Sequence, residues 1–202
     1  MSEPRNKKLK TIVPVCKTHC SLMGSKVKQN LPGIVEEGLC GVSTAIMEFS
    51  YRLQALAKIF DQDDLALPRV AAYLHHESER EQERAEAMLH YLSERGGRYC
   101  NKVIGRPGTE QVCALLPALV LLLGQWKEEM NIIVELCELA REHGDAHSAS
   151  VLKSHFLQPL VPKIKLLGDL LTNARRVGCT NKGSGGYGEY LIDQLYGELT
   201  SA

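Results

Sequence analysis

The sequence has few aromatic residues and no long apolar segment. Only 5% of its 202 residues are Phe, Trp or Tyr. The longest apolar run, 112–124, contains Pro117 and is shorter than the roughly 20 residues that span a bilayer. The N-terminus also lacks the apolar core of a secretory signal. We therefore predict no membrane span and no membrane partner.

The seven cysteines form no C-x-x-C pair. Cys16 and Cys20 are the nearest two, and only His19 lies close to them in the sequence. A structural zinc site needs four ligands, so this spacing does not favour one. Reduced thiols are the normal state in the cytosol, and we predict a cytoplasmic protein.

The sequence also has no excess of charge of either sign, but its charged residues are unevenly distributed. Formal net charge is zero, yet residues 1–28 hold seven of the Lys and Arg residues and one acid. This composition predicts a basic arm over residues 1–26 without regular structure, followed by one domain over residues 27–202. The body that follows the arm is acidic, so we predict no nucleic-acid partner.

Apolar residues recur at steps of three and four from Ile34 to Phe60, which predicts a first helix. A second helix has Pro68 in its first turn, where proline is tolerated, and runs to Arg95. Residues 96–111 are predicted to form a long connection with a short extended piece near Val103.

A third helix is predicted from about residue 112 to 143. Gly144 ends it, and Asp145 is a suitable N-cap for a fourth helix to about residue 177. A short fifth helix is predicted over residues 187–199. Four long helices with one long crossover predict an all-α four-helix bundle with a short fifth C-terminal helix.

Two prolines, Pro159 and Pro162, fall inside the predicted fourth helix. Each lacks a backbone donor and clashes with the carbonyl four residues earlier, so we expect a kink near residue 158. Pro117 either bends the start of the third helix or delays it.

The second helix is dense in charge, yet Ala85, Met88 and Leu92 keep an apolar stripe, and it stops at Gly96-Gly97. The pattern S-E-R-E-Q-E-R-A-E followed by R-G-G-R resembles the second helix of ferritin subunits. Further matches follow in the same order along the chain. They are V-K-Q-N at 27–30, F-D-Q-D-D-L-A-L at 60–67, I-G-R-P at 104–107, S-H-F-L at 154–157, L-G-D at 167–169, T-N-A-R at 172–175 and E-Y-L-I-D at 189–193. The resemblance to the ferritin family covers residues 27–200 and implies a ferritin-like bundle that assembles into an octahedral shell storing ferric iron.

Ferroxidase subunits of that family oxidise Fe(II) inside the bundle, with carboxylate and imidazole ligands that suit iron. The resemblance puts five residues at the ligand positions and Leu53 where a Tyr is usual. The five are Ile46, Glu81, Arg84, Trp126 and Leu160. Only Glu81 keeps the ligand type, so we predict that the chain is not an enzyme and has no catalytic or cofactor-binding residues. Arg84, three residues after Glu81, is predicted to pair with its carboxylate.

A relocated iron site is the alternative, with Glu81 joined by Glu48, Glu77 or Glu128. Glu48 and Glu128 each follow a core position by two residues, about 200° around the helix. We therefore expect these two to face solvent.

Heavy-type shells also admit Fe(II) through acidic pores, and the resemblance places Ser150 and Lys153 there. Lysines gathered around one axis would repel a divalent cation. This prediction agrees with the loss of the oxidation ligands.

Four residues of the second helix, His76, Glu79, Glu83 and Glu86, are spaced by three and four. They form either a stripe that binds ferric ions or an ordinary solvated face with arginines interleaved. We predict iron contacts at Glu81, Glu79, Glu83 and His76.

These observations predict a ferritin-type subunit of intracellular iron storage. It binds ferric iron or assembles with itself and other ferritin subunits. The alternative hypothesis is a divergent structural or interaction protein of the same fold that no longer handles iron.

Overall fold

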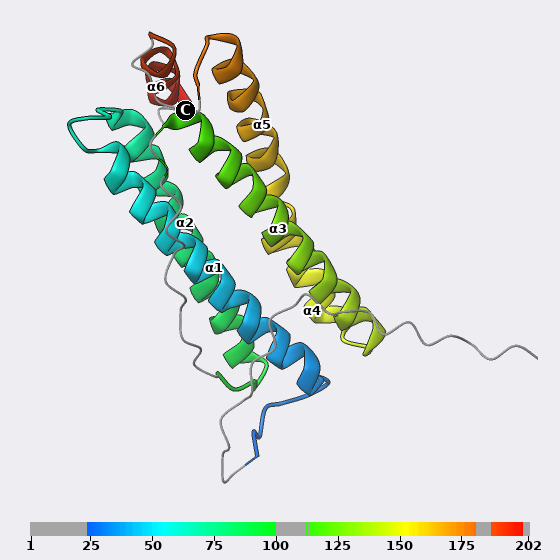
Figure 1. Ribbon diagram of the computed structural model, residues 1–202. Coiled ribbons are helices and arrows are strands. Elements are labelled where there is room, and N and C mark those ends of the chain that lie inside the picture. Colours follow the sequence, from blue (N-terminus) through cyan, green and yellow to red (C-terminus); the bar gives the residue numbers. More distant parts are fainter. Residues whose placement is uncertain (1–23, 100–111, 113, 181–186, 200–202) are drawn as a thin grey trace, which may run out of the picture.

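The computed structural model describes residues 24–99, 112, 114–180 and 187–199. Within these ranges every regular element is a helix, and the long helices run side by side as one bundle (Figure 1). The predicted arm over residues 1–26 and the extended piece near Val103 fall largely or wholly outside the described residues. None of the described helices is long and apolar enough to cross a membrane.

Helices α1 (Gly33–Phe60) and α2 (Pro68–Glu94) form the most closely packed pair of the bundle. Their apolar stripes face each other, and two serines bring the backbones together. Ser50 Oγ donates to the Ser78 carbonyl at 2.9 Å, and Ser78 Oγ donates to the Ser50 carbonyl at 3.0 Å. Gly96 closes α2 with a φ of 71°, a left-handed value that favours glycine. The predicted bounds of both helices are confirmed to within one residue.

Helix α3 spans Leu115–Glu142, so it begins three residues later than predicted. Pro117 stands in its first turn, where a backbone N–H has no partner within the helix. Gly144, with a φ of 77°, follows the end of α3. Asp145 then caps the next helix by accepting a hydrogen bond from the Ser148 amide at 3.0 Å, as predicted.

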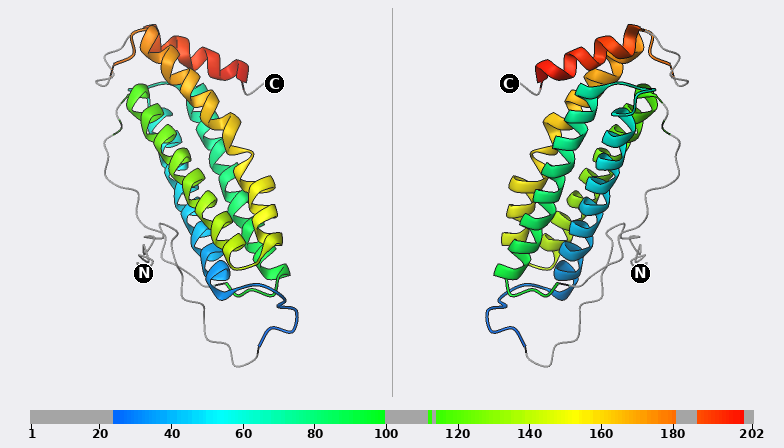
Figure 2. Two further views of the ribbon diagram at one scale, coloured as in Figure 1. Left: turned by 90° about the vertical axis from the view of Figure 1, so that its right-hand side faces the viewer. Right: turned by 90° about the vertical axis from the view of Figure 1, so that its left-hand side faces the viewer.

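The fourth rod of the bundle is continuous in Figure 2 but not one regular helix. It consists of α4 (Ala146–Val151), the π-helical segment η1 (Leu152–Leu157) and α5 (Leu160–Arg176). The wider π-helical turn comes directly before Pro159, which has no amide hydrogen to donate. The kink predicted near residue 158 remains a prediction; what the structure has beside it is the π-helical segment that ends at Leu157.

Helix α6 (Tyr187–Leu199) lies across one end of the bundle (Figure 2). Two of its carboxylates cap other helices. Asp193 Oδ1 accepts from the Arg69 and Val70 amides at 2.9 and 3.0 Å, and Glu189 Oε1 accepts from the Leu115 amide at 3.0 Å. The acidic groups complement the positive N-terminal ends of α2 and α3, and they fix α6 to the bundle.

Candidate functional site

The middle of the bundle contains a cluster of buried charges, which we call the central cluster. Its carboxylates are Glu77 and Glu81 from α2 and Glu129 from α3, with exposed fractions of 2, 0 and 7%. Its cations are Arg84 from α2 and Lys163 from α5. Buried charges persist only when they are paired, so the contacts inside the cluster decide its properties.

Glu81 has the most partners in the central cluster. Its Oε2 pairs with Arg84, as predicted. Its Oε1 accepts from Lys163 Nζ at 2.8 Å and from Trp126 Nε1 at 3.3 Å. Both oxygens of this carboxylate therefore hold protein donors.

The two cations connect the carboxylates. Arg84 Nη1 also lies 2.9 Å from Glu129 Oε1, and its Nη2 donates to the Phe156 carbonyl at 2.9 Å. Lys163 Nζ lies 2.6 Å from Glu77 Oε2. The charges thus alternate across the bundle, from α3 through α2 to α5.

Glu129 is the least satisfied member of the central cluster. Neither of its carboxylate oxygens makes a hydrogen bond with good geometry in the part of the chain that the structure describes. Burial, then the charge of Glu81, raises the pKa of Glu129 to about 7, and Arg84 and Lys163 offset part of that shift. This carboxyl group therefore changes its charge near neutral pH.

The apolar residues that the resemblance placed at the iron ligands, and Leu53 where a Tyr is usual, lie in the core. Ile46, Leu53, Trp126 and Leu160 are all buried. The Trp126 ring meets the ring of Phe49 edge-on at 5.4 Å, and Lys163 Nζ lies 5.5 Å from the Trp126 ring centre. Cation–π attraction thus adds to the ion pairs of Lys163.

Three members of the central cluster, Glu77, Glu129 and Lys163, were not predicted from the sequence to lie in the core. Glu129 and Lys163 each follow a buried position, Trp126 or Leu160, by three residues. This is the spacing that separates Arg84 from Glu81, and it would have put both on the inner face. Glu77 lies four residues before Glu81 and follows the same rule.

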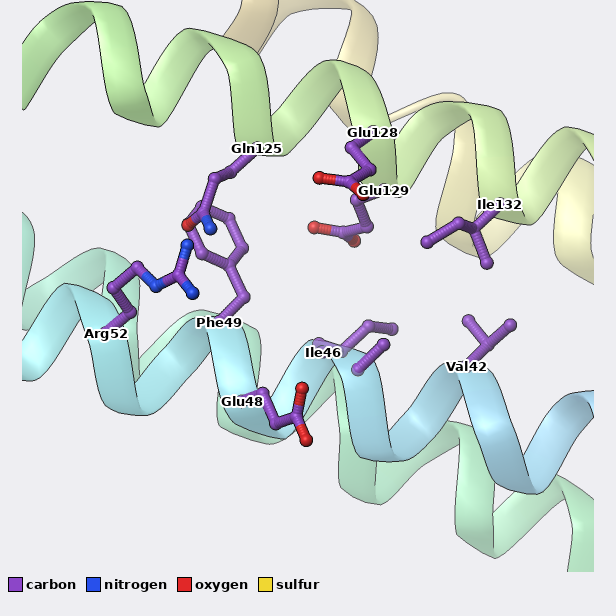
Figure 3. A pocket seen from close by; sticks show the side chains of 10 residues that line it. Val42, Ile46, Glu48, Phe49, Arg52, Gln125, Glu128, Glu129 and Ile132 are labelled. Atoms are coloured by element: carbon purple, nitrogen blue, oxygen red, sulfur yellow. The ribbon is translucent and has the colours of Figure 1, made fainter. Parts of the chain in front are cut away.

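The expectation that Glu48 and Glu128 face solvent holds fully for one of them. Glu128 is exposed, and Glu48 is half-buried. Both line a cavity between α1 and α3 (Figure 3). Neither is brought to Glu81.

The predicted iron stripe lies on the exposed face of α2, which points away from the interior of the bundle. His76, Glu79, Glu83 and Glu86 are all exposed, whereas Glu81 points into the bundle. Glu79 lies 4.0 Å from His75 Nε2, and Glu86 accepts from Gln82 at 3.3 Å. No three His, Cys, Asp or Glu side chains of the described residues are grouped closely enough to hold a metal ion. The structure therefore separates Glu81 from the other three predicted contacts.

Ser150 and Lys153 are exposed on α4 and η1. A pore is formed between several subunits, so the charge reversal expected there remains a prediction.

Comparisons with known proteins agree on one family. The family model for the ferritin-like domain matches residues 42–177. The soma ferritin of Lymnaea stagnalis is 35% identical over 170 residues, which cover 84% of this chain and 94% of that protein. The oocyte isoform of the ferritin light chain of Xenopus laevis is 31% identical over 171 residues, covering 85% and 95% of the two chains. The ferritin middle subunit of Aquarana catesbeiana is 32% identical over 172 residues, covering 85% and 96%.

The prediction that the chain is not an enzyme is wrong. The matched relatives are ferritin subunits, a class that typically has ferroxidase activity. The prediction assumed that Glu81 is the single carboxylate inside the bundle. The structure instead buries Glu77 and Glu129 in the same cluster. The residues at the five ligand positions therefore do not reveal how many carboxylates lie inside the bundle.

The helical bundle, its short C-terminal helix and the matches over most of the sequence lead to one assignment. The chain belongs to the ferritin family and is a ferritin-type subunit of iron storage.

Proposed function

We propose that this subunit assembles in the cytosol into an octahedral shell, alone or with other ferritin subunits, and that ferric iron binds along the exposed stripe of α2, on the side that faces the cavity of the shell. The family generally forms multi-subunit shells. The observation that carries the assembly proposal is the unpaired outer face of α6.

Helix α6 divides its apolar residues between two faces. Ile192 and Tyr196 are buried against the bundle, with exposed fractions of 0 and 1%. Tyr187, Tyr190 and Leu195 remain 73, 55 and 40% exposed in the single chain. A 13-residue helix is marginal without packing, and contiguous exposed apolar side chains mark contact surfaces. We therefore assign this face to a contact between subunits.

Sedimentation of the full chain, expressed alone and with a heavy-type ferritin subunit, tests assembly. We expect a large closed particle in at least one case. Tyr190→Asp should shift the protein to small species, whereas Val161→Ser, an equally exposed apolar site on α5, should not. Monomer or dimer alone in both preparations would refute the shell.

The stripe of His76, Glu79 and Glu83 supports iron binding because hard oxygen ligands and imidazole suit iron. These side chains are exposed and spaced along one face. Glu81 as a fourth contact remains a prediction, since its oxygens hold Lys163, Trp126 and Arg84 in this structure.

Iron retained by the purified shell after loading and gel filtration tests the stripe. The triple variant His76→Ala, Glu79→Gln, Glu83→Gln should retain less iron than wild type. The control variant Glu94→Gln, an exposed carboxylate on the same helix, should match wild type. Equal retention in the triple variant would refute the stripe, and no retention in wild type would favour the divergent structural protein.

A further inference from the structure

The face of α3 beside α1 carries a row of carboxylates, which we call the acidic row. Glu128, Glu135 and Glu142 are spaced by seven residues, and a helix drifts only about 20° between such positions. Glu128 and Glu142 are exposed, and Glu135 is half-buried. Ile132 and Leu139 lie between them on the same face and are half-buried against the core. Figure 3 shows Glu128 and Ile132 at the near end of this row.

Neighbouring bases on α3 do not neutralise the acidic row. Lys127 and Arg141 each precede an acid of the row by one residue, which puts them about 100° around the helix. Within the described ranges, Glu128 and Glu142 have no ion-pair partner. The row therefore presents accessible negative charge to a cationic partner.

The N-terminal arm leaves the bundle at the end where α3 finishes. Asn30 Nδ2 donates to the Gly144 carbonyl at 3.2 Å, and Glu142 is the last residue of α3. Gly24 is six residues before Asn30, so these two lie within about 20 Å of each other. The seven residue steps from Lys17 to Gly24 can extend about 23 Å. The arm is thus long enough to bring Lys17 to Glu142.

The spacing of two lysines in the arm matches the length of the acidic row. Lys10 and Lys17 are seven residues apart, a step of about 23 Å in extended backbone. Glu128 and Glu142 are fourteen residues apart on a helix, a distance of about 21 Å. An extended segment can therefore place one lysine at each end of the row.

The residues between the lysines match the middle of the row. Ile12, Val13 and Val15 stand between Lys10 and Lys17, as Ile132 and Leu139 stand between the outer glutamates. A proline follows Val13, and the residue before a proline favours extended backbone. The segment thus combines apolar and charged groups in the order that the row requires.

We propose that residues 10–17 bind in extended form along the acidic row of the same chain, with Lys17 at Glu142 and Lys10 at Glu128. Each exposed ion pair is weak by itself, but the short tether keeps the segment at a high local concentration. Salt weakens the contact, because the screening length falls from about 10 Å at 0.1 M to about 3 Å at 1 M. The contact needs neither iron nor a shell.

Carbodiimide cross-linking of the full-length, iron-free protein tests the proposal, because this reagent joins a lysine amine to a carboxylate that it contacts. Mass spectrometry of the products formed at low salt should find links from Lys17 to Glu142 and from Lys10 to Glu128. Their yield should fall at least fivefold in 1 M NaCl. The absence of these links, or links to carboxylates of α2 in their place, would overturn the proposal.

A mixture of ¹⁴N-labelled and ¹⁵N-labelled chains, allowed to assemble together, shows which chain supplies the segment. Binding within one chain gives links between peptides of the same isotope. Links between different isotopes in statistical proportion would assign the row to the arm of a neighbouring chain and would overturn the proposal.

Trypsin cleavage after Lys10 and Lys17 gives an independent measurement. The double variant Glu128→Gln, Glu142→Gln should be cleaved there at least threefold faster than wild type at low salt, and at the wild-type rate in 1 M NaCl. The control Glu79→Gln, Glu86→Gln removes two exposed carboxylates of α2 and should match wild type. Equal cleavage of the first variant and wild type at low salt would refute binding to the row. Particle size and iron retention are measured separately, so failure of the storage proposal does not affect this result.

Discussion

Two buried carboxylates of the bundle, Asp145 and Glu129, have opposite electrostatic behaviour. Asp145 lies at the end of the bundle and accepts from the Ser148 amide, the Ser148 hydroxyl at 2.6 Å and both Arg95 terminal nitrogens at 3.2 and 3.3 Å. Burial acts to raise the pKa of Asp145, but the Ser148 and Arg95 hydrogen bonds outweigh it, so the pKa is lowered. Glu129 has one ion-pair partner, and its pKa is raised to about 7.

The difference shows that burial alone does not decide which form of a carboxyl group is favoured. Both side chains have little exposed surface, 0% for Asp145 and 7% for Glu129, yet only the pKa of Asp145 is lowered. Hydrogen bonds to the charged form decide the sign. The cap region is therefore a satisfied ionic site, and the central cluster is an under-satisfied one.

The largest predicted effect is that of Arg84→Ala in the central cluster. The substitution leaves Glu129 without a cation and removes one of the two from Glu81, so we expect a loss of about 3–5 kcal/mol in unfolding free energy. Denaturant unfolding at neutral pH measures it. The control Arg80→Ala removes an arginine that is 56% exposed and should cost less than about 1 kcal/mol.

Adding Glu129→Leu to Arg84→Ala should recover part of this loss, because the unpaired charge disappears with it. If the unfolding free energy of Arg84→Ala alone is within about 0.5 kcal/mol of the wild-type value, these side chains lie in solvent. The contrast between the central cluster and the cap region would then be wrong.

The second prediction concerns pH. The folded-state pKa of Glu129 is raised from its usual 4.5 to about 7. Between these values the folded chain binds a proton that the unfolded chain has released, so this group makes stability fall as pH rises from 4.5 to 7. Each pKa unit corresponds to about 1.4 kcal/mol.

Glu129→Gln removes this dependence. Relative to wild type, the variant should gain up to about 3 kcal/mol between pH 5 and pH 8, by the same conversion. Unfolding measured at both values checks it, with Glu128→Gln as the exposed control. A parallel pH dependence in wild type and Glu129→Gln would contradict the raised pKa.

A smaller effect is predicted at α6. Asp193→Ala removes the carboxylate that accepts from the Arg69 and Val70 amides, and loss of such a cap costs about 1 kcal/mol. Limited proteolysis should release α6 faster from this variant. Asp193→Asn retains the accepting oxygen, so its cleavage rate should lie between those of wild type and Asp193→Ala. Identical cleavage of all three proteins would show that the cap does not hold α6.

The smallest effect is expected for the pair of Lys165 and Asp169 on α5. Their side chains are 74 and 57% exposed, so Asp169→Ala should change stability by less than about 0.5 kcal/mol. Thermal unfolding measures this. A loss as large as that of Arg84→Ala would mean that exposure does not separate the two kinds of ion pair.

Sequence patterns predicted the helices well because their signals are local. Apolar residues spaced by three and four marked α1 and α2, and Gly144 with Asp145 marked the boundary between α3 and α4. The start of α3 was left open, because Pro117 could bend or delay it, and the structure has the later start at Leu115. The proline rule predicted a kink near residue 158 but not the π-helical segment Leu152–Leu157 that precedes Pro159.

The central cluster was only partly predictable. The pair of Glu81 and Arg84 lies on one helix, so its spacing was sufficient. The contacts of Glu129 and Lys163 cross between α3, α2 and α5, and no local rule predicts which distant partner a charged residue meets. The count of one internal carboxylate was too low for a different reason, because Glu129, three residues after Trp126, and Glu77, four residues before Glu81, also lie at inner-face spacings.

Residue-specific ¹³C NMR titration of Glu129 and Asp145 in the metal-free protein tests the account most directly. We predict that Glu129 titrates near pH 7, while Asp145 titrates below the usual range of an aspartate. Titration of Glu129 near 4.5, the usual value for a solvated glutamate, would show that it is not the under-satisfied member of a buried cluster and would contradict the account.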